Sequence, residues 1–267
     1  MKHIIALLLA LLLSLTVNAQ SYRLFSSDDA LPNTLINDIF QDHLGLIWVA
    51  TEDGLCCYNG VKFVTYQHKD GDETSLSHNL VRCVLEDKNG NLWVGTHNGL
   101  QNFDRNKQQF SPLAKDNKGK LLMGNVNKII QLSNGEVWVS GNDLYKATKD
   151  GDNIEAKIID YPGPHHYIQD MMEDASGNIW SMHLHDGIYL YRKRDKAVKH
   201  YFGDIDGVTY MRIAADERGN VFAAAHGMGV MRFNKSLDKF EVIPGTENLL
   251  AINLDFNGNG VMFIGTD

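Results

Sequence analysis

The sequence predicts an all-β protein, a β-propeller of four-stranded antiparallel blades, on two observations. The first is a repeat: one aromatic residue recurs at intervals of 41 to 45 residues, as Trp48, Trp93, Trp138, Trp180, Phe222 and Phe263. The second is that an Asp-x-x-Gly sequence precedes most of these aromatic residues. A period of this size, filled by four short strands, is typical of one propeller blade.

Each repeat contains four candidate strands. In the first repeat, apolar stretches at 36–40 and 47–50 flank the turn, a Gly-Leu pair opens a third strand at 55–58, and a weaker fourth covers 62–66. The turn aspartate can bond its own backbone and the glycine accepts positive φ, so the turn joins the first two strands as a hairpin. We expect the aromatic residue to pack between neighbouring blades. No repeat shows the i, i+3, i+4, i+7 spacing of a helical solenoid.

The ends of the chain carry two further expectations. Residues 1–19 combine a basic start at Lys2, a short apolar run and a small-residue site at Ala19, which is the pattern of a cleaved signal peptide. The propeller then occupies 20–267, with about five full blades and a partial sixth, because the sixth copy stops in the middle of the motif. We therefore expect an incomplete ring and a fragment of a longer protein, whose remaining blades and downstream sensor domains are expected partners.

Charge and motifs exclude several function classes. The formal net charge is −8, the wrong sign for a surface that binds nucleic acid or an anionic membrane. The sequence has no G-x-S-x-G, no H-E-x-x-H and no P-loop, so it shows no catalytic motif and no cofactor is expected.

Three cysteines, Cys56, Cys57 and Cys83, remain in this expected exported chain. An odd, small number does not describe a disulfide framework. Neighbouring strand residues point to opposite faces, so at most one of Cys56 and Cys57 could face Cys83. Burial as small apolar residues is the favoured interpretation.

The repeated motif resembles a known repeat, the two-component regulator propeller, with the pattern D-x-x-G-x-I/L-W-x-G-T-x-x-G-L. Residues 87–100 match it almost position by position, and 42–55 nearly so. The resemblance implies the periplasmic sensor region of a hybrid two-component histidine kinase of the Bacteroidetes, which recognises oligosaccharides and switches on genes for their use. The kinase modules are absent from this chain, so no enzyme activity is expected and the chain cannot signal alone. A homodimer is a further expected partner. The alternative is a propeller enzyme such as a polysaccharide lyase.

Two sets of candidate ligand-binding residues follow from blade geometry. Loops on one face of the propeller carry aromatic and hydrogen-bonding side chains suited to sugars, namely His97, His165, His166, Tyr167, His185 and His226. A metal site built from these histidines, or scattered surface histidines, are the other interpretations. Eleven residues before the aligned aromatic stand polar residues that either line the channel mouth or satisfy strand-end backbone, namely Asn37, Arg82, Asn127 and Gln169.

Overall fold

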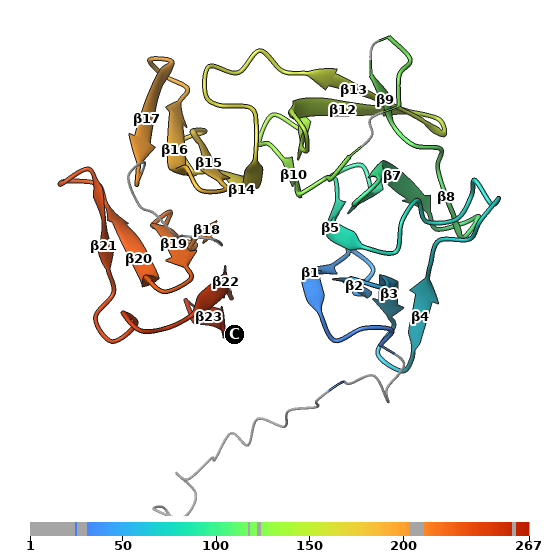
Figure 1. Ribbon diagram of the computed structural model, residues 1–267, viewed down its shortest axis with the longest axis horizontal. Coiled ribbons are helices and arrows are strands. Elements are labelled where there is room, and N and C mark those ends of the chain that lie inside the picture. Colours follow the sequence, from blue (N-terminus) through green and yellow to red (C-terminus); the bar gives the residue numbers. More distant parts are fainter. Residues whose placement is uncertain are drawn as a thin grey trace, which may run out of the picture.

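The computed structural model describes Phe25 and residues 31–116, 118–121, 124–202, 211–257 and 260–266. The expected signal peptide at 1–19 lies outside these residues. Within them the chain is all-β, and no helix is long and apolar enough to cross a membrane. Figure 1 shows successive sheets arranged as an arc around a common axis, with β1 at one end and β22 and β23 at the other. The predicted propeller is confirmed, with five full blades and a partial sixth.

Four blades are four-stranded antiparallel sheets in chain order. Their strands are β1 (Ile36–Gln41), β2 (Ile47–Thr51), β3 (Gly54–Tyr58) and β4 (Phe63–Tyr66); β5 (Val81–Glu86), β6 (Leu92–Thr96), β7 (Gly99–Asp104) and β8 (Gln109–Phe110); β14 (Ile168–Glu173), β15 (Ile179–His183), β16 (Gly187–Arg192) and β17 (Ala197–Tyr201); and β18 (Met211–Ala215), β19 (Val221–Ala225), β20 (Gly229–Asn234) and β21 (Lys239–Val242).

The third and sixth blades depart from this plan. In the third, β10 (Lys128–Gln131), β11 (Val137–Ser140), β12 (Leu144–Asp150) and β13 (Asn153–Ile158) gain a fifth strand, β9 (Lys115–Asp116), which pairs in parallel with β13. The periodicity did not predict β9. The sixth blade contains β22 (Ala251–Phe256) and β23 (Met262–Thr266).

The turn aspartate holds the blade together through its side chain as well as its backbone. Asp87 Oδ1 accepts hydrogen bonds from the amides of Asn89 and Asn91, both at 2.9 Å, and Oδ2 accepts one from Trp93 Nε1 at 2.9 Å. The first and fourth blades repeat the aspartate-to-indole bond at 2.9 and 3.0 Å. A carboxylate six residues before the aromatic therefore closes the turn and satisfies a buried indole N–H.

Two of the five full blades lack the bond between the turn aspartate and an indole N–H. The third blade has a shorter turn, and Glu136 Oε2 accepts the indole hydrogen bond of Trp138 at 3.1 Å instead. In the fifth blade Phe222 has no N–H to satisfy, and the guanidinium carbon of Arg232 lies 6.0 Å from its ring centroid. The register survives both changes because the aromatic position still packs in the core.

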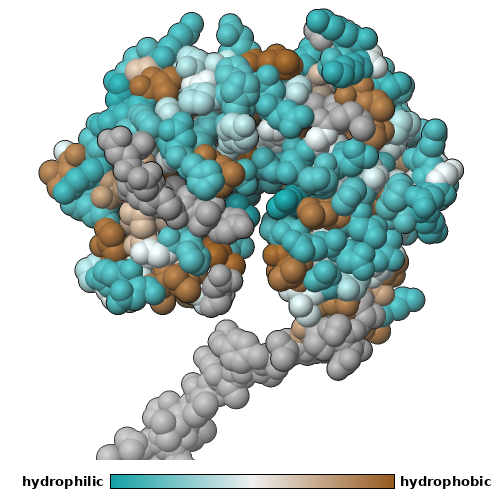
Figure 2. Space-filling model, viewed as in Figure 1, coloured by the Kyte–Doolittle hydropathy of each residue, from teal (hydrophilic) through white to brown (hydrophobic). Residues whose placement is uncertain are grey.

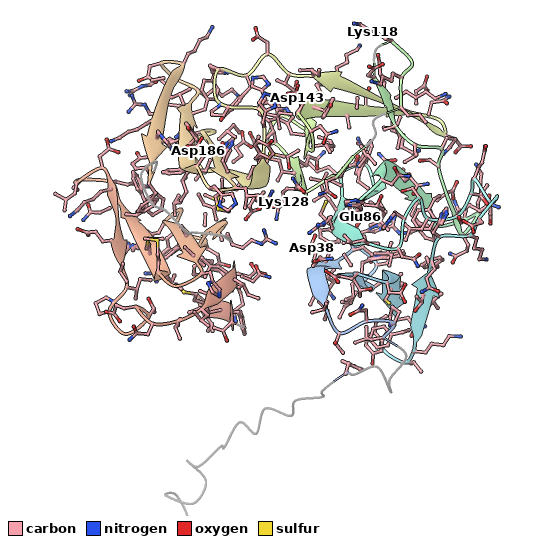
Figure 3. The ribbon with its side chains drawn as sticks, in the orientation of Figure 1. Asp38, Glu86, Lys118, Lys128, Asp143 and Asp186 are labelled. Carbon is pink, nitrogen blue, oxygen red and sulfur yellow. The ribbon has the colours of Figure 1, made fainter. Side chains whose placement is uncertain are left out.

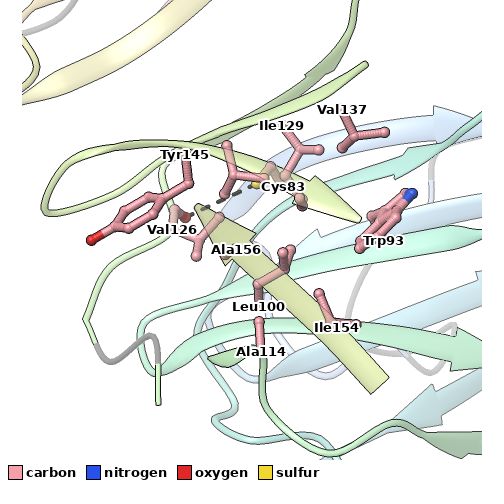
Figure 4. Close-up of a cluster of buried hydrophobic side chains, with 12 residues drawn as sticks. Cys83, Trp93, Leu100, Ala114, Val126, Ile129, Val137, Tyr145, Ile154 and Ala156 are labelled. Atoms are coloured by element: carbon pink, nitrogen blue, oxygen red, sulfur yellow. Dashed lines mark hydrogen bonds between the residues drawn. The ribbon is translucent and has the colours of Figure 1, made fainter. Parts of the chain in front are cut away.

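The aligned aromatic residues of the first five blades pack between blades, as predicted. Trp93 lies in one buried cluster with Ile129, Val137 and Ala147 of the third blade (Figure 4). Trp48, Trp138, Trp180 and Phe222 take equivalent places against the blade that follows each of them. Phe263 in the sixth blade is 57% exposed, whereas Trp48 is 1% exposed. Burial of this residue thus depends on the blade that follows it.

The three cysteines are free and buried. Cys83 Sγ lies 4.0 Å from the backbone oxygen of Val126, inside the cluster of Figure 4. Burial raises the pKa of Cys57 to about 11 and raises that of Cys83 as well. The prediction of buried, unpaired thiols is confirmed, and no disulfide joins Cys83 to its neighbours.

Candidate functional site

The first strands of the blades surround a cavity of about 410 Å³ on the axis of the arc. Residues from β1, β5, β10, β14, β18 and β22 line it. Figure 2 shows the hollow bordered by both hydrophilic and hydrophobic side chains, and Figure 3 places Asp38 and Lys128 at the inner edge of the arc. This channel cavity is the candidate functional site.

One structural position supplies most of the polar groups. The residue ten positions before the aligned aromatic lines the cavity in every blade, as Asp38, Cys83, Lys128, Asp170, Arg212 and Asn253. In four blades the strand pairing shifts register just before this residue, which turns its side chain relative to a regular strand. Sequence reasoning selected the preceding position. The repeat alignment does contain a signal for the correct position, because four of the six residues ten positions before the aromatic are charged.

Two aspartates of this position join neighbouring blades. Asp38 Oδ2 accepts a hydrogen bond from the amide of Val84, in the next blade, at 3.0 Å. Asp170 Oδ2 accepts the equivalent bond from the amide of Ile213, also at 3.0 Å. Because the two contacts occupy matching places in different blades, they are part of the way that inner strands are held together.

The enclosed charges perturb one another. Burial raises the pKa of Asp38, against the opposing influence of Lys128, the Val84 amide and Arg212. Lys128 Nζ lies 3.1 Å from Asp170 Oδ1, with 33% of the Lys128 side chain and 3% of the Asp170 side chain exposed. The Asp170 carboxylate raises the pKa of Lys128, and burial opposes it. Lys128 therefore stays charged beside its aspartate.

Two arginines of the cavity, unlike Lys128, have no charged partner among the described residues. Arg82 and Arg212 both line it, and neither guanidinium forms a hydrogen bond or an ion pair within the part of the chain that the structure describes. The Nε atom of Arg82 is buried and has no acceptor. A buried donor without an acceptor is rare in folded proteins, so these side chains are open to a ligand.

Only some of the polar residues that the sequence predicted at the channel mouth line this cavity. Asn37, Arg82 and Asn127 line the cavity, whereas Gln169 is not among the lining residues. Asn37 Nδ2 donates to the backbone oxygen of Val81 at 2.8 Å, and Asn127 Nδ2 donates to that of Ile168 at 3.0 Å. Both asparagines therefore also satisfy strand-end backbone. Ligand binding by this set stays a prediction.

The structure places the histidine set on loops of several blades. His165 and His166 lie together on the loop after β13, where His165 Nδ1 is 3.0 Å from Asp143 Oδ1 and His166 Nδ1 is 3.3 Å from the backbone oxygen of Asn142. Tyr167, beside them, is 70% exposed with a φ of 58°.

The other three histidines follow the second strands of three different blades, and His185 lies beside the loop of Tyr167, because the amide of Leu184 donates to the Tyr167 backbone oxygen at 3.0 Å. His97 follows β6 and its ring centroid is 5.2 Å from that of His78, while His185 and His226 follow β15 and β19. The described residues contain no group of three or more His, Cys, Asp or Glu side chains that could hold a metal ion. Sugar contact by the loop around His165 stays a prediction.

Comparison with solved structures supports the fold. The extracellular domain of a putative hybrid two component system from B. thetaiotaomicron superposes with a TM-score of 0.75 and 21% identity, over 91% of this chain and 34% of that one. A streptogramin B lyase superposes with a TM-score of 0.66 and 14% identity, over 88% of this chain and 78% of that one. At these identities the likeness shows a common propeller fold.

Sequence comparisons are more specific. A histidine kinase from Formosa agariphila is 35% identical over 69 residues, which are 24% of this chain and 5% of that protein. The chain thus spans a small part of that kinase and about a third of the solved extracellular domain. The profile of the family described as "Two component regulator propeller" matches residues 30–53 and 75–98, the turn and aromatic regions of the first two blades. In these two segments the chain therefore carries repeats of the two-component regulator propeller family.

Proposed function

We propose that this chain is a ligand-sensing propeller region of a two-component signal transduction regulator, exported to the periplasm, and that its ligand is an oligosaccharide. The observation that carries the proposal is the channel cavity, in which polar side chains from all six blades converge and two arginines have no partner among the described residues. The family repeats and the likeness to an extracellular domain of a hybrid two component system support the signalling context.

The chemistry of the cavity fits binding by polar contacts. Sugars need several hydrogen-bond donors and acceptors held in fixed positions. Asn37 and Asn127 are fixed by bonds to backbone oxygens, and Lys128 is fixed by Asp170. A rigid, polar cavity of this kind orders few groups on binding, which favours affinity.

The test is a binding screen of the chain against neutral and acidic oligosaccharides. We expect one class of saccharide to raise the thermal unfolding temperature, because a ligand at about one hundred times its dissociation constant stabilises the native state by about 2.7 kcal/mol. Isothermal titration calorimetry then gives the affinity, and chromatography shows whether the saccharide is recovered unchanged. Absence of stabilisation across the screen would contradict binding. Turnover of the saccharide would favour the lyase alternative.

A further inference from the structure

The channel cavity is lined by equal numbers of positive and negative side chains, but the two kinds differ in how many of their hydrogen-bonding groups the protein already uses. Three cations and three carboxylates line it, and they are Arg82, Lys128, Arg212, Asp38, Asp170 and Asp255. What a ligand meets depends on which of these groups still have unused hydrogen-bonding capacity.

The carboxylates are engaged by the protein itself. Asp38 accepts hydrogen bonds from the amides of Ile39 at 3.1 Å and Val84 at 3.0 Å, one on each oxygen. Asp170 accepts the amide of Met171 on Oδ1 and that of Ile213 on Oδ2, both at 3.0 Å, in addition to the Lys128 ammonium.

The third carboxylate belongs to Asp255, which is exposed at the rim. Its Oδ1 accepts the amide of Phe256 at 2.8 Å. None of the three carboxylates is paired with an arginine of the cavity among the described residues.

The cations have donors to spare. A guanidinium carries five N–H donors, and those of Arg82 and Arg212 reach no acceptor among the described residues, with Arg82 Nε buried. Lys128 has three ammonium hydrogens and one carboxylate partner, Asp170. The cavity therefore presents unused positive donors inside a chain whose formal net charge is −8.

We infer that the channel cavity binds the anionic group of an acidic oligosaccharide, a carboxylate or a sulfate, through Arg82 and Arg212. Guanidinium groups match these oxyanions in geometry and charge, and such hydrogen bonds are stronger than those between neutral groups. Lys128 adds a third donor, while Asn37 and Asn127 border the same space. The inference rests on the proposed sensor role and adds the charge of the ligand to it.

The experiment follows the Nε–Hε resonances of the arginines by NMR. The chain is titrated with sodium glucuronate, sodium sulfate and the uncharged methyl ester of glucuronic acid at constant ionic strength. Arg82→Lys and Arg212→Lys assign the two resonances, since lysine has no Nε–Hε of this kind. We expect a saturable shift at both arginines with an anion and none with the ester. A response to glucuronate or to sulfate distinguishes the two anionic groups.

Variants give the matched comparison. Arg82→Gln and Arg212→Gln should each weaken binding of the responding anion about tenfold, the size expected for one lost charged hydrogen bond. Arg194→Gln removes the same charge at an exposed site on the hairpin between β16 and β17, outside the lining of the cavity, and should leave binding unchanged. Circular dichroism checks that each variant is folded, and the lysine variants give a second measurement if a glutamine variant is not.

The results of these titrations distinguish a failure of this inference from a failure of the proposed function. No saturable shift with either anion, or equal binding of the methyl ester, overturns the inference. A neutral oligosaccharide that binds the wild type and both glutamine variants equally would leave the sensor proposal standing and refute the anionic ligand. Binding of sulfate with no binding of any saccharide would refute the sensor proposal and, with it, an acidic saccharide as ligand.

Discussion

The bond between the turn aspartate and the indole offers a sharp test of how the blades are stabilised. Asp87→Ala removes the acceptor of Trp93 Nε1, and both residues are buried, with Asp87 6% and Trp93 1% exposed. A buried hydrogen bond to a charged acceptor contributes about 2 kcal/mol, and the bonds to the part-buried turn amides, which water can partly replace, add about 1 kcal/mol. We expect Asp87→Ala to lower the free energy of unfolding by about 3 kcal/mol.

Asp216→Ala is the matched control. Asp216 accepts the same turn bonds, from the amides of Arg218 at 3.0 Å and Asn220 at 2.8 Å, but the residue that follows in register is Phe222, which has no N–H. This substitution should cost only about 1 kcal/mol. Urea unfolding followed by far-ultraviolet circular dichroism measures both. Equal losses in the two variants would refute the assignment of the larger cost to the indole bond.

Three other expectations concern pH, packing and the thiols. Burial alone would raise the pKa of Asp42, but hydrogen bonds from Trp48, Leu46 and Arg105 lower it. The stability from Asp42 is therefore complete above its unfolded pKa of about 4 and is lost as pH falls through the lower folded value. Urea midpoints should show a weaker acid dependence in Asp42→Asn, and an unchanged dependence would contradict this. Gly95→Ala should destabilise by about 1–3 kcal/mol, because the added Cβ would lie 2.5 Å from a Val126 methyl carbon; wild-type unfolding temperature in this variant would count against it. The three buried thiols should react with a disulfide reagent only in denaturant, and fast labelling of the native chain would show that they are accessible.

The fold could be predicted from the sequence because its controlling signals are local and repeated. An aspartate, a glycine and an aromatic residue at fixed spacing define one hairpin in four of the blades, and hairpins of slightly different length precede the aromatic in the other two. Strand β9 escaped prediction because it has two residues and pairs with β13, about forty residues further along the chain. Such a pairing depends on tertiary proximity, which a short polar segment does not encode.

The candidate site was harder to predict because it depends on where side chains point. Arg82 was selected from the sequence and lines the cavity, but Asp38, Lys128, Asp170 and Arg212 were missed. The irregular pairing near the start of the inner strands changes which side chain faces the axis, and an alternating pattern read from sequence gives no sign of it. His97 and His226 each stand four residues after an aligned aromatic, so the repeat already assigns them to different blades, but the distances between such loops depend on the three-dimensional arrangement of the blades.

The contacts between inner strands have a consequence for how the propeller would respond to a ligand. Asp38 to Val84 and Asp170 to Ile213 each tie one blade to the next, so every blade is coupled mainly to its immediate neighbours. In such linear arrays, blades can loosen one at a time. A molecule on the axis would touch several blades at once and would link blades that do not follow one another in the chain. Its binding should therefore sharpen the unfolding transition as well as shift it, making the blades unfold as a single cooperative unit.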